Sequence, residues 1–371
     1  MSTAAPVRRP PRDESVPAPR GRDGGALRVT VVAGLLCVTL LLGVTLALTV
    51  GSTPLTVGQV SSALFGLGGV DHQVVTIVWE VRVPRAVTAL LAGAALGVAG
   101  AQMQTLLRNP LAEPYILGVS AGASLGVAAV VLGAGSAGGA FVSIGGAYGR
   151  AGLVVASALG AGAVLALVLV LARWTKSVVT LLIIGVMVGS GVTSFVSLLM
   201  SLSDPERMQR FVLWGLGNFS ATTWPDLAWF APIVAVGILA ALTLMKPLNA
   251  LLLGETYAQT MGVPVRLVRW LVILCASVLA GTVTAFCGPV AFLGLAIPHL
   301  TRIALGTTNH RVLLPGTALM GACVAVLCGT VAVLPGVGGV LPLNVVTSLI
   351  GAPIVIGVLI RSRAAQQGVG V

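Results

Sequence analysis

Long apolar runs separated by short polar stretches dominate the chain. The ten longest runs each span roughly 17 to 25 residues, the length that an α-helix needs to cross a bilayer. The strands of a membrane β-barrel would instead alternate apolar and polar residues, and these runs do not. The pattern therefore predicts an all-α membrane protein with ten transmembrane helices, at residues 29–50, 83–107, 115–134, 151–172, 178–200, 227–245, 270–286, 289–306, 312–334 and 343–360.

The polar stretches between these runs predict the connections. Residues 51–81 predict an outer loop with a short helix at 57–65. The segment 203–226 is amphipathic and aromatic, so we place it at the outer interface, where Trp side chains are favoured. Residues 246–269 are too polar to span the bilayer. They predict short helices with a break at Gly254.

Both ends of the chain are expected to be tails. Residues 1–28 contain six Arg and five Pro, which predicts a disordered cytoplasmic tail. The apolar run that follows is too long for the core of a signal peptide. We therefore assign residues 29–363 to one membrane domain and residues 364–371 to a C-terminal tail. An even number of helices places both tails on one side of the membrane.

The distribution of basic residues indicates which side this is. With both ends inside, the inner segments contain 16 of the 21 Lys and Arg residues. Cytoplasmic loops of membrane proteins carry such an excess, so both termini are predicted to be cytoplasmic. The five outer basic residues are Arg82, Arg85, Arg150, Arg207 and Arg210.

A short pattern recurs in the two halves of the chain. In each half, a Leu-Ala-Gly triplet is followed by Gly after seven residues and by Pro after ten more. We interpret the match as two copies of one structural unit. With five helices in each copy, the second must be inverted relative to the first, an arrangement typical of transporters. The matched positions are Leu91, Ala92, Gly93, Gly100 and Pro110 in the first copy, and Leu279, Ala280, Gly281, Gly288 and Pro298 in the second.

Composition narrows the class of partner. The chain is 57% hydrophobic and 8% charged, whereas soluble domains have roughly 25% charged residues. The lipid bilayer is therefore its solvent. The net charge of +11 does not indicate nucleic acid, because Lys and Arg lie at the ends of apolar runs. The five cysteines lie within apolar runs without metal-ligand spacing, so no metal site is expected.

No enzyme motif is present. The chain contains no GxxxxGK[ST] sequence and is not expected to bind ATP itself. HExxH, GxSxG and paired intramembrane carboxylates are also missing, and we interpret His299 as a packed residue rather than a proton relay. Residues 151–172, 177–203 and 312–360 carry no charge. Ion-driven carriers place ionisable groups at the membrane midplane, so the energy for transport is expected to come from a partner.

Two predicted helices carry small polar residues on one face, at steps of three and four residues. They are candidates for a translocation path, although small polar residues also let helices pack closely, and both interpretations stay open. The candidate path residues are Met187, Ser190, Ser194 and Ser197 in the fifth helix, and Asn344, Thr347 and Ser348 in the tenth.

Five motifs together resemble the FecCD family, the membrane permeases of type II ABC importers for iron-siderophores, haem and cobalamin. They are RVPR before a glycine-rich helix, MQTLLRNPLAEPYILGVSAGASLG, GETYAQTMGV, GPVAFLGLAIPHLTR and LPLNVVTSLIGAP. The resemblance covers roughly residues 30–362. It implies a fold similar to that of the cobalamin-importer permease, in the bacterial cytoplasmic (inner) membrane. It also implies a second permease subunit, identical or different, around a central path.

The resemblance further implies two soluble partners. A dimer of cytosolic ATPases would bind ATP and Mg, and this chain would bind no cofactor. An extracytoplasmic solute-binding lipoprotein would deliver the substrate. Arg82 and Arg85 match arginines that dock this protein, and exposed Arg side chains suit bidentate contacts to carboxylates. Anchoring at lipid headgroups is the alternative. The uncharged segment PGVGGVLPLN departs from family members that carry charge there, so we expect docking to be asymmetric or to involve a different permease subunit that supplies the charge.

Two inner regions also match. Residues 246–269 match the segment that couples the permease to the ATPase. The coupling residues are Gly254, Glu255, Tyr257, Ala258, Gln259 and Gly262, with polar contacts from Glu255, Tyr257 and Gln259 and close packing from Ala258. Asn109 and Leu111 match an inner gate, to which Thr175 and Ser177 are further candidates. We expect an importer of ferric siderophores, with haem or cobalamin as alternatives. A secondary transporter and a non-transporting scaffold are the rival classes.

Overall fold

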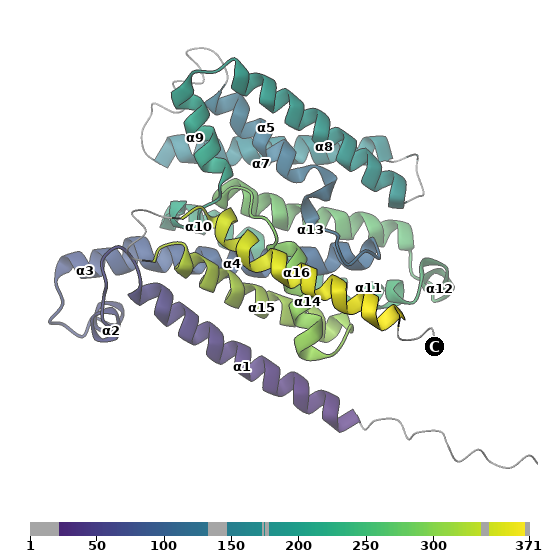
Figure 1. The fold of residues 1–371 in the computed structure, drawn as a ribbon, viewed down its shortest axis with the longest axis horizontal. Helices are drawn as coiled ribbons and strands as arrows, with labels where there is room; N and C mark the ends of the chain where they lie inside the picture. The colour runs from purple at the N-terminus through teal and green to yellow at the C-terminus, as the bar shows by residue number, and fades with distance from the viewer. Residues whose placement is uncertain (1–21, 133–146, 173, 175–177, 335–340, 368–371) are drawn as a thin grey trace, which may run out of the picture.

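The structure is a computed structural model that describes residues 22–132, 147–172, 174, 178–334 and 341–367. Its described residues are helical apart from short connections, and none of them forms a strand, which confirms the all-α class (Figure 1). The helices are α1 (Arg22–Thr49), α2 (Val57–Phe65), α3 (His72–Thr76), the π-helix η1 (Ile77–Arg82), α4 (Val83–Leu106), the 3-10 helix η2 (Pro114–Leu117), α5 (Val119–Val131), α7 (Ala147–Ala172), α8 (Val178–Ser201), α9 (Pro205–Gly215), the 3-10 helix η3 (Phe219–Ala221), α10 (Trp224–Thr243), α11 (Met245–Leu252), α12 (Glu255–Thr260), α13 (Val265–Cys287), α14 (Leu293–Leu305), α15 (His310–Val331) and α16 (Leu343–Gln367).

Seven of these helices are long and apolar enough to cross a membrane. Three further apolar helices are shorter, at Val119–Val131, Leu293–Leu305 and Leu343–Gly357. The predicted short helix at 57–65 is confirmed as α2, and residues 246–269 form α11, α12 and the start of α13. The outermost helices extend further than predicted, because α1 begins at Arg22 and α16 ends at Gln367. Hydrophobicity marks the apolar part of a helix and not its ends.

The rod formed by α3, η1 and α4 lies at the centre of the bundle. It runs without interruption from His72 to Leu106, and α4 packs against α13, α14 and α15. Glycines allow these helices to approach very closely. A Cβ atom on Gly93 would lie 2.0 Å from the carbonyl oxygen of Gly321 in α15, and one on Gly100 would lie 1.8 Å from that of Gly294 in α14. Such small-residue contacts are typical of helix packing in membranes.

The contacts of α4 and α13 support the predicted inverted repeats. α13 packs against α4, α5 and α7, just as α4 packs against α13, α14 and α15. The matched glycines have corresponding neighbours. Gly93 lies against α15, and Gly281 lies against Ala161 in α7. The two helices are antiparallel, because the end of α13 and the start of α4 lie beside the same segment: Asn218 binds Cys287, and Thr222 binds Thr88.

The matched Gly and Pro positions after the Leu-Ala-Gly triplet do not have equivalent places in the two repeats. Gly100 lies inside α4, whereas Gly288 caps the end of α13 with a φ of +74°. Pro110 lies in a connection, whereas Pro298 lies inside α14. The repeats therefore share their central packing, while their helices end at different distances from it.

The connection between α4 and α5 differs most from the prediction. α5 begins at Val119 rather than 115, and the preceding segment lies against α14. His299 Nε2 donates to the carbonyl of Pro110 over 2.8 Å, and the backbone N–H of Phe292 donates to the Glu113 carboxylate. α5 and α14 each have 13 residues, or about 20 Å of helix. Non-helical backbone is tolerated at this depth because protein groups surround it.

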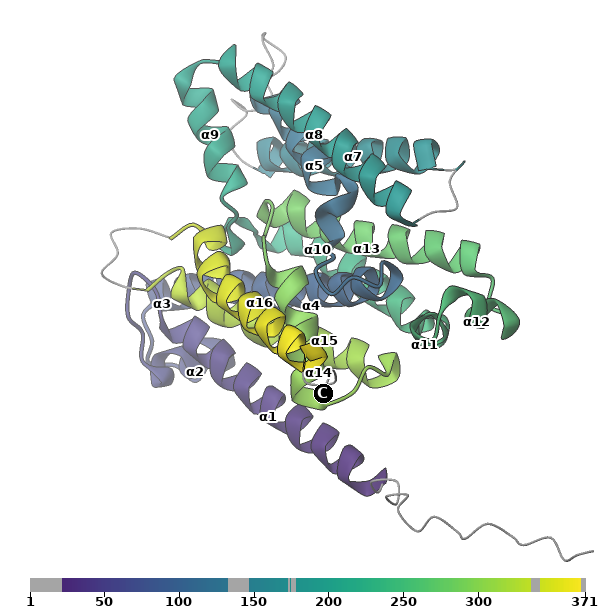
Figure 2. The same ribbon diagram turned by 45° about the vertical axis from the view of Figure 1, so that its right-hand side comes forward.

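The bundle has two ends, which Figures 1 and 2 show on opposite sides. We call one the α9 end; it holds α2, α3, α9 and the starts of α4 and α16. We call the other the α12 end; it holds α11, α12 and the ends of α4 and α14. α1 also starts there, because Arg28 donates to the carbonyls of Ile303 and Ala304 at the end of α14. Both described termini therefore point toward the α12 end.

Candidate functional site

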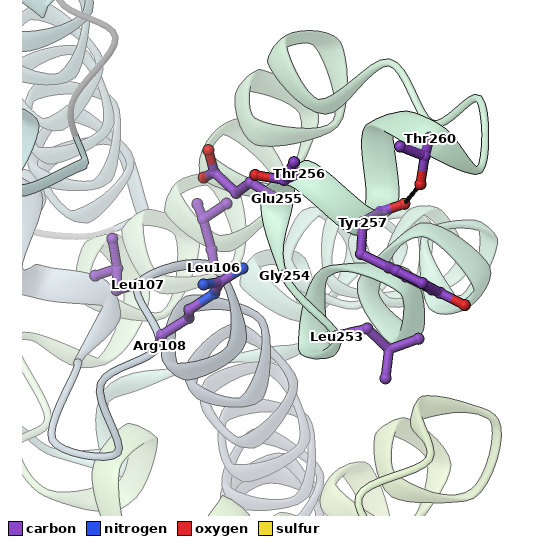
Figure 3. Close-up of a pocket in the computed structure, with 9 residues that line it drawn as sticks. All are labelled: Leu106, Leu107, Arg108, Leu253, Gly254, Glu255, Thr256, Tyr257 and Thr260. Carbon is purple, nitrogen blue, oxygen red and sulfur yellow. Dashed lines mark hydrogen bonds between the residues drawn. The ribbon is translucent and has the colours of Figure 1, made fainter.

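A cavity at the α12 end separates the last turn of α4 from the junction between α11 and α12 (Figure 3). Its volume is about 660 Å³. The junction turns at Gly254, whose φ of +121° is open only to glycine without strain. The lining residues are Leu106, Leu107, Arg108, Leu253, Gly254, Glu255, Thr256, Tyr257 and Thr260. The cavity therefore lies between the predicted coupling segment and the end of α4, directly before the predicted gate turn.

The short helix α12 presents one polar face outward. Tyr257 and Gln259 are exposed, as predicted for residues that contact a partner, and so is Gly262. The prediction for Ala258 is wrong, because its side chain is fully buried within its own subunit. Glu255 is half-buried and binds Arg269, with its two carboxylate oxygens 2.9 and 3.1 Å from Nη2. The sequence analysis missed Thr256, Thr260 and Met261, which are exposed beside Tyr257 and Gln259.

α4 ends in a Schellman motif. The N–H of Arg108 donates to Thr105 over 3.3 Å, and the N–H of Asn109 donates to Gln104 over 3.2 Å. The residue after the helix cap is left-handed in this motif and is usually glycine. Here it is Arg108, with a φ of +46°, a conformation that costs an L-residue roughly 1 to 2 kcal/mol. The sequence analysis ended this helix at residue 107 and gave Arg108 no role.

The gate turn follows directly. Asn109 shapes it, since its side-chain oxygen accepts the N–H of Leu111 over 2.9 Å and its carbonyl accepts the N–H of Ala112. Leu111 projects outward and is 41% exposed. These positions suit the predicted gate, whose role stays a prediction. Thr175 and Ser177, the other gate candidates, lie outside the described residues.

The two arginines predicted to dock a partner are buried at the α9 end. Arg82 is 3% exposed and Arg85 is 6% exposed, so the exposure that the prediction assumed is wrong. Arg82 donates to the carbonyls of Leu48 and Thr53, and Arg85 donates to those of Ala47 and Val50. The last carbonyls of a helix have no partner within it. The forked guanidinium groups supply those partners at the end of α1.

The two candidate path helices behave differently. Met187, Ser190, Ser194 and Ser197 are all exposed on α8. Ser190 and Ser194 line a cavity of about 640 Å³ with Tyr115, Ser120 and Ser124, among others. The hydroxyl of Ser194 donates to Ser190 within the helix. This wall therefore exposes neutral hydroxyl oxygens to the cavity.

On α16, the side chain of Asn344 forms hydrogen bonds that join this helix to other segments of the chain. The side-chain amide of Asn344 donates to Gly215 and Pro289, and its oxygen accepts the N–H of Ala291. Thr347 is fully buried, and Ser348 is half-buried. The packing alternative therefore holds for Thr347, which is buried. Asn344 is half-buried, so its role in a path stays a prediction. The interpretation of His299 as a packed residue agrees with its bond to Pro110.

Comparisons with known proteins agree with this arrangement. Residues 39–361 match the model of the FecCD transport family. The chain is 37% identical over 287 residues to the vitamin B12 import system permease protein BtuC of Salmonella typhi, covering 77% of this chain and 84% of the relative. It is 37% identical over 298 residues to the uncharacterized ABC transporter permease protein YvrB of Bacillus subtilis (strain 168), covering 80% of this chain and 82% of the relative.

One solved structure has a fold similar to that of this chain. The solved structure titled "An inward-facing conformation of a putative metal-chelate type ABC transporter" is 31% identical to this chain and matches it with a TM-score of 0.76. The match covers 90% of this chain and 99% of the other. The matched range of the family model contains the cavity at the α12 end, the buried arginines and the α8 wall.

Proposed function

Because the chain belongs to the FecCD transport family, whose members are permeases of type II ABC importers, we propose that it imports metal chelates. ATP hydrolysis on separate subunits would drive this import. The observation that supports this most directly is the cavity at the α12 end. It lies between an exposed polar helix and the end of α4, directly before the turn that carries Asn109 and Leu111. A partner that pushes on α12 would act on this turn.

The ATPase dimer would bind at the α12 end, in the cytosol, and hold ATP and Mg. Support comes from the outward face of α12, with Thr256, Tyr257, Gln259 and Met261. Among the described residues, Glu255 is held at the edge of this face by Arg269. The permease itself would carry out no chemistry, and its membrane would be the bacterial inner membrane.

A second permease subunit would complete the path. The wall formed by Ser190 and Ser194 is exposed in the single chain, and a path through a membrane needs a closed circumference. A second copy or a related subunit would supply the opposite wall. A solute-binding lipoprotein would dock at the α9 end, against the exposed charges of α9 rather than against the two buried arginines. These charges include Asp204, Glu206 and Arg210.

The substrate class follows from the relatives. One is named for vitamin B12 import and the solved structure for a metal-chelate transporter. Cobalamin is a chelate of cobalt and a ferric siderophore is a chelate of iron, so we propose this shared class. Ferric siderophores are not favoured over cobalamin, and haem is the third candidate. The neutral α8 wall suits a large solute that passes without tight binding, so selectivity would belong to the binding protein.

The test is uptake by a reconstituted complex. The permease, its ATPase and its binding protein would be placed in liposomes, and entry of radiolabelled cobalamin, haem and a ferric siderophore would be followed with and without ATP. We expect ATP-dependent uptake of one chelate, unaffected by a protonophore. Uphill uptake without the ATPase would support a secondary transporter instead. A complex that moves no solute and whose ATPase ignores the loaded binding protein would support a scaffold.

A further inference from the structure

Arg108 holds an unusual backbone conformation at the end of α4. Among the described residues, only Arg108 and Phe292 have a positive φ without being glycine. The position that Arg108 occupies in the Schellman motif favours glycine, because a side chain is strained there. A strained residue at a candidate site points to a role for its side chain. The contacts of the Arg108 side chain therefore indicate what this role is.

The guanidinium of Arg108 reaches across to the junction between α11 and α12. Figure 3 shows the side chain pointing from the end of α4 toward Gly254. Nη2 donates to the carbonyl of Leu251 over 3.4 Å, and a Cβ atom on Gly254 would lie 3.5 Å from the same nitrogen. Two backbone positions with positive φ, Arg108 and Gly254, thus face each other. Arg108 ends the helix before the predicted gate, and Gly254 forms the turn before α12.

A second bridge joins α11 to the same turn of α4. The side-chain oxygen of Asn249 accepts the backbone N–H of His310 over 2.8 Å and lies 2.9 Å from His310 Nδ1. His310 Nε2 lies 2.9 Å from Thr105 Oγ1. We assign the ring proton to Nδ1, because the amide of Asn249 already donates to Asn309 and its oxygen can only accept. His310 is fully buried, so water does not compete for these bonds.

The gate turn is held at its other end by α14. His299 binds the carbonyl of Pro110, and the N–H of Phe292 binds Glu113. The turn therefore lies between two anchors. One is α14, and the other is the last turn of α4. Arg108 bonds this turn directly to α11, and His310 connects Thr105 to Asn249 in α11. The last turn of α4 is also bonded to α14, because Gln104 donates to the carbonyl of Leu295 and accepts from Arg302. A displacement of α11 and α12 would therefore act on this turn through Arg108 and Thr105 while Gln104 holds it to α14.

We propose that Arg108 is a positioning residue that, together with the Asn249–His310–Thr105 bridge, transmits movement of α12 to the inner gate. This rests on the proposed function, because it assumes that an ATPase moves α12. Partner binding would shift α12 about the Gly254 hinge, and Arg108 would pull the end of α4 with it. The strained conformation persists because glycine, which suits the backbone better, has no side chain to make this contact.

The decisive variant is Arg108→Gly in the complete transporter. Glycine suits a φ of +46°, so the turn is kept and thermal stability should stay equal or rise. ATP hydrolysis should continue, while uptake per ATP hydrolysed should fall about tenfold, within the usual range of coupling between sites. Asn also tolerates this conformation, so Arg108→Asn should show the same loss of coupling. It serves as a second variant in case Arg108→Gly does not fold. Arg108→Lys can still donate to Leu251 and should retain most coupling.

A second readout follows the gate itself. In a Cys37→Ser background, which removes the one exposed cysteine among the described residues, Leu111→Cys would be labelled with a thiol reagent with and without ATP. ATP should change the labelling rate with Arg108 present, and this change should vanish in Arg108→Gly and in Asn249→Ala. A stable Arg108→Gly transporter with normal coupling and labelling would overturn the inference alone. A native complex without ATP-dependent uptake would overturn the proposed function and the inference together.

Discussion

The two ends of the α4 rod carry arginines that do opposite things. At the α9 end, Arg82 and Arg85 are buried and donate to the carbonyls that end α1. At the α12 end, Arg108 is exposed, strained and joined to α11 by a single long hydrogen bond. The sequence motif drew attention to the first pair. The difference teaches that buried arginines whose donors are occupied satisfy the backbone of the fold, whereas the exposed, strained Arg108 is the residue that we propose to transmit movement.

The largest effect should come from removing both buried arginines. In Arg82→Ala with Arg85→Ala, the carbonyls at the end of α1 lose their donors, and each buried group left unpaired costs about 1 to 3 kcal/mol. We expect a marked loss of thermal stability in detergent. Arg210→Ala, in an exposed pair with Glu206 on α9, is the matched control and should be nearly neutral. If the double variant were stable but failed to bind the solute-binding protein, the docking role would hold after all.

The next effect compares two neighbours on α12. Ala258→Leu puts extra volume into a fully buried site, and overpacking typically costs about 1 to 3 kcal/mol. Gln259→Leu changes an exposed residue and should leave stability unchanged while weakening binding of the ATPase. Thermal unfolding and ATPase pull-down separate the two outcomes. A stable Ala258→Leu that loses the ATPase would mean that Ala258 faces the partner.

A smaller effect is expected for the ion pair of α12. Glu255→Ala removes the partner of Arg269, and because the pair is partly exposed the loss of stability should be under about 1 kcal/mol. High salt should reduce the difference between the variant and the native protein. The functional effect should exceed the structural one, since α12 loses its orientation: uptake should fall while melting temperature hardly moves. Equal uptake in both proteins would assign Glu255 to the solvated surface.

The smallest effect should be found on the α8 wall, between the two ends. The Ser194 hydroxyl donates to its own helix, so Ser194→Ala should change stability by less than about 0.5 kcal/mol. Uptake should also be unchanged. Ser194→Phe fills part of the cavity that Ser194 lines and should slow uptake. A strong loss of uptake in Ser194→Ala would instead indicate that this hydroxyl binds the substrate.

Some of the site could be predicted because its cause is local. The break at Gly254 and the short helices of residues 246–269 follow from residues within that segment, and the structure confirms them. The late start of α5 also had a local signal. Pro110, Pro114 and Gly118 lie within nine residues, and each disfavours a helix. The apolar run hid this signal, because hydrophobicity alone does not distinguish a helix from a buried extended segment.

Other features depend on residues far apart in the chain. The polar spacing on α16 resembles that on α8, yet Asn344 joins α9 to the connection after α13, while Ser194 lines a cavity. Spacing places residues on one face of a helix but does not say what that face meets. Arg108 was missed for a similar reason, because neither its left-handed backbone nor its contact with Leu251 can be read from the residues around it.

The sequence alone determined that this protein is helical and embedded in lipid, where its apolar segments lie and which family it resembles, because the transfer of side chains into a bilayer adds up along the chain and needs no knowledge of neighbours. Tertiary structure decided which polar groups are hydrogen-bonded within the protein and which are exposed at its surface. A hydrogen bond or a burial depends on atoms that folding brings together from distant positions, as Arg85 with Ala47 and His310 with Thr105 demonstrate.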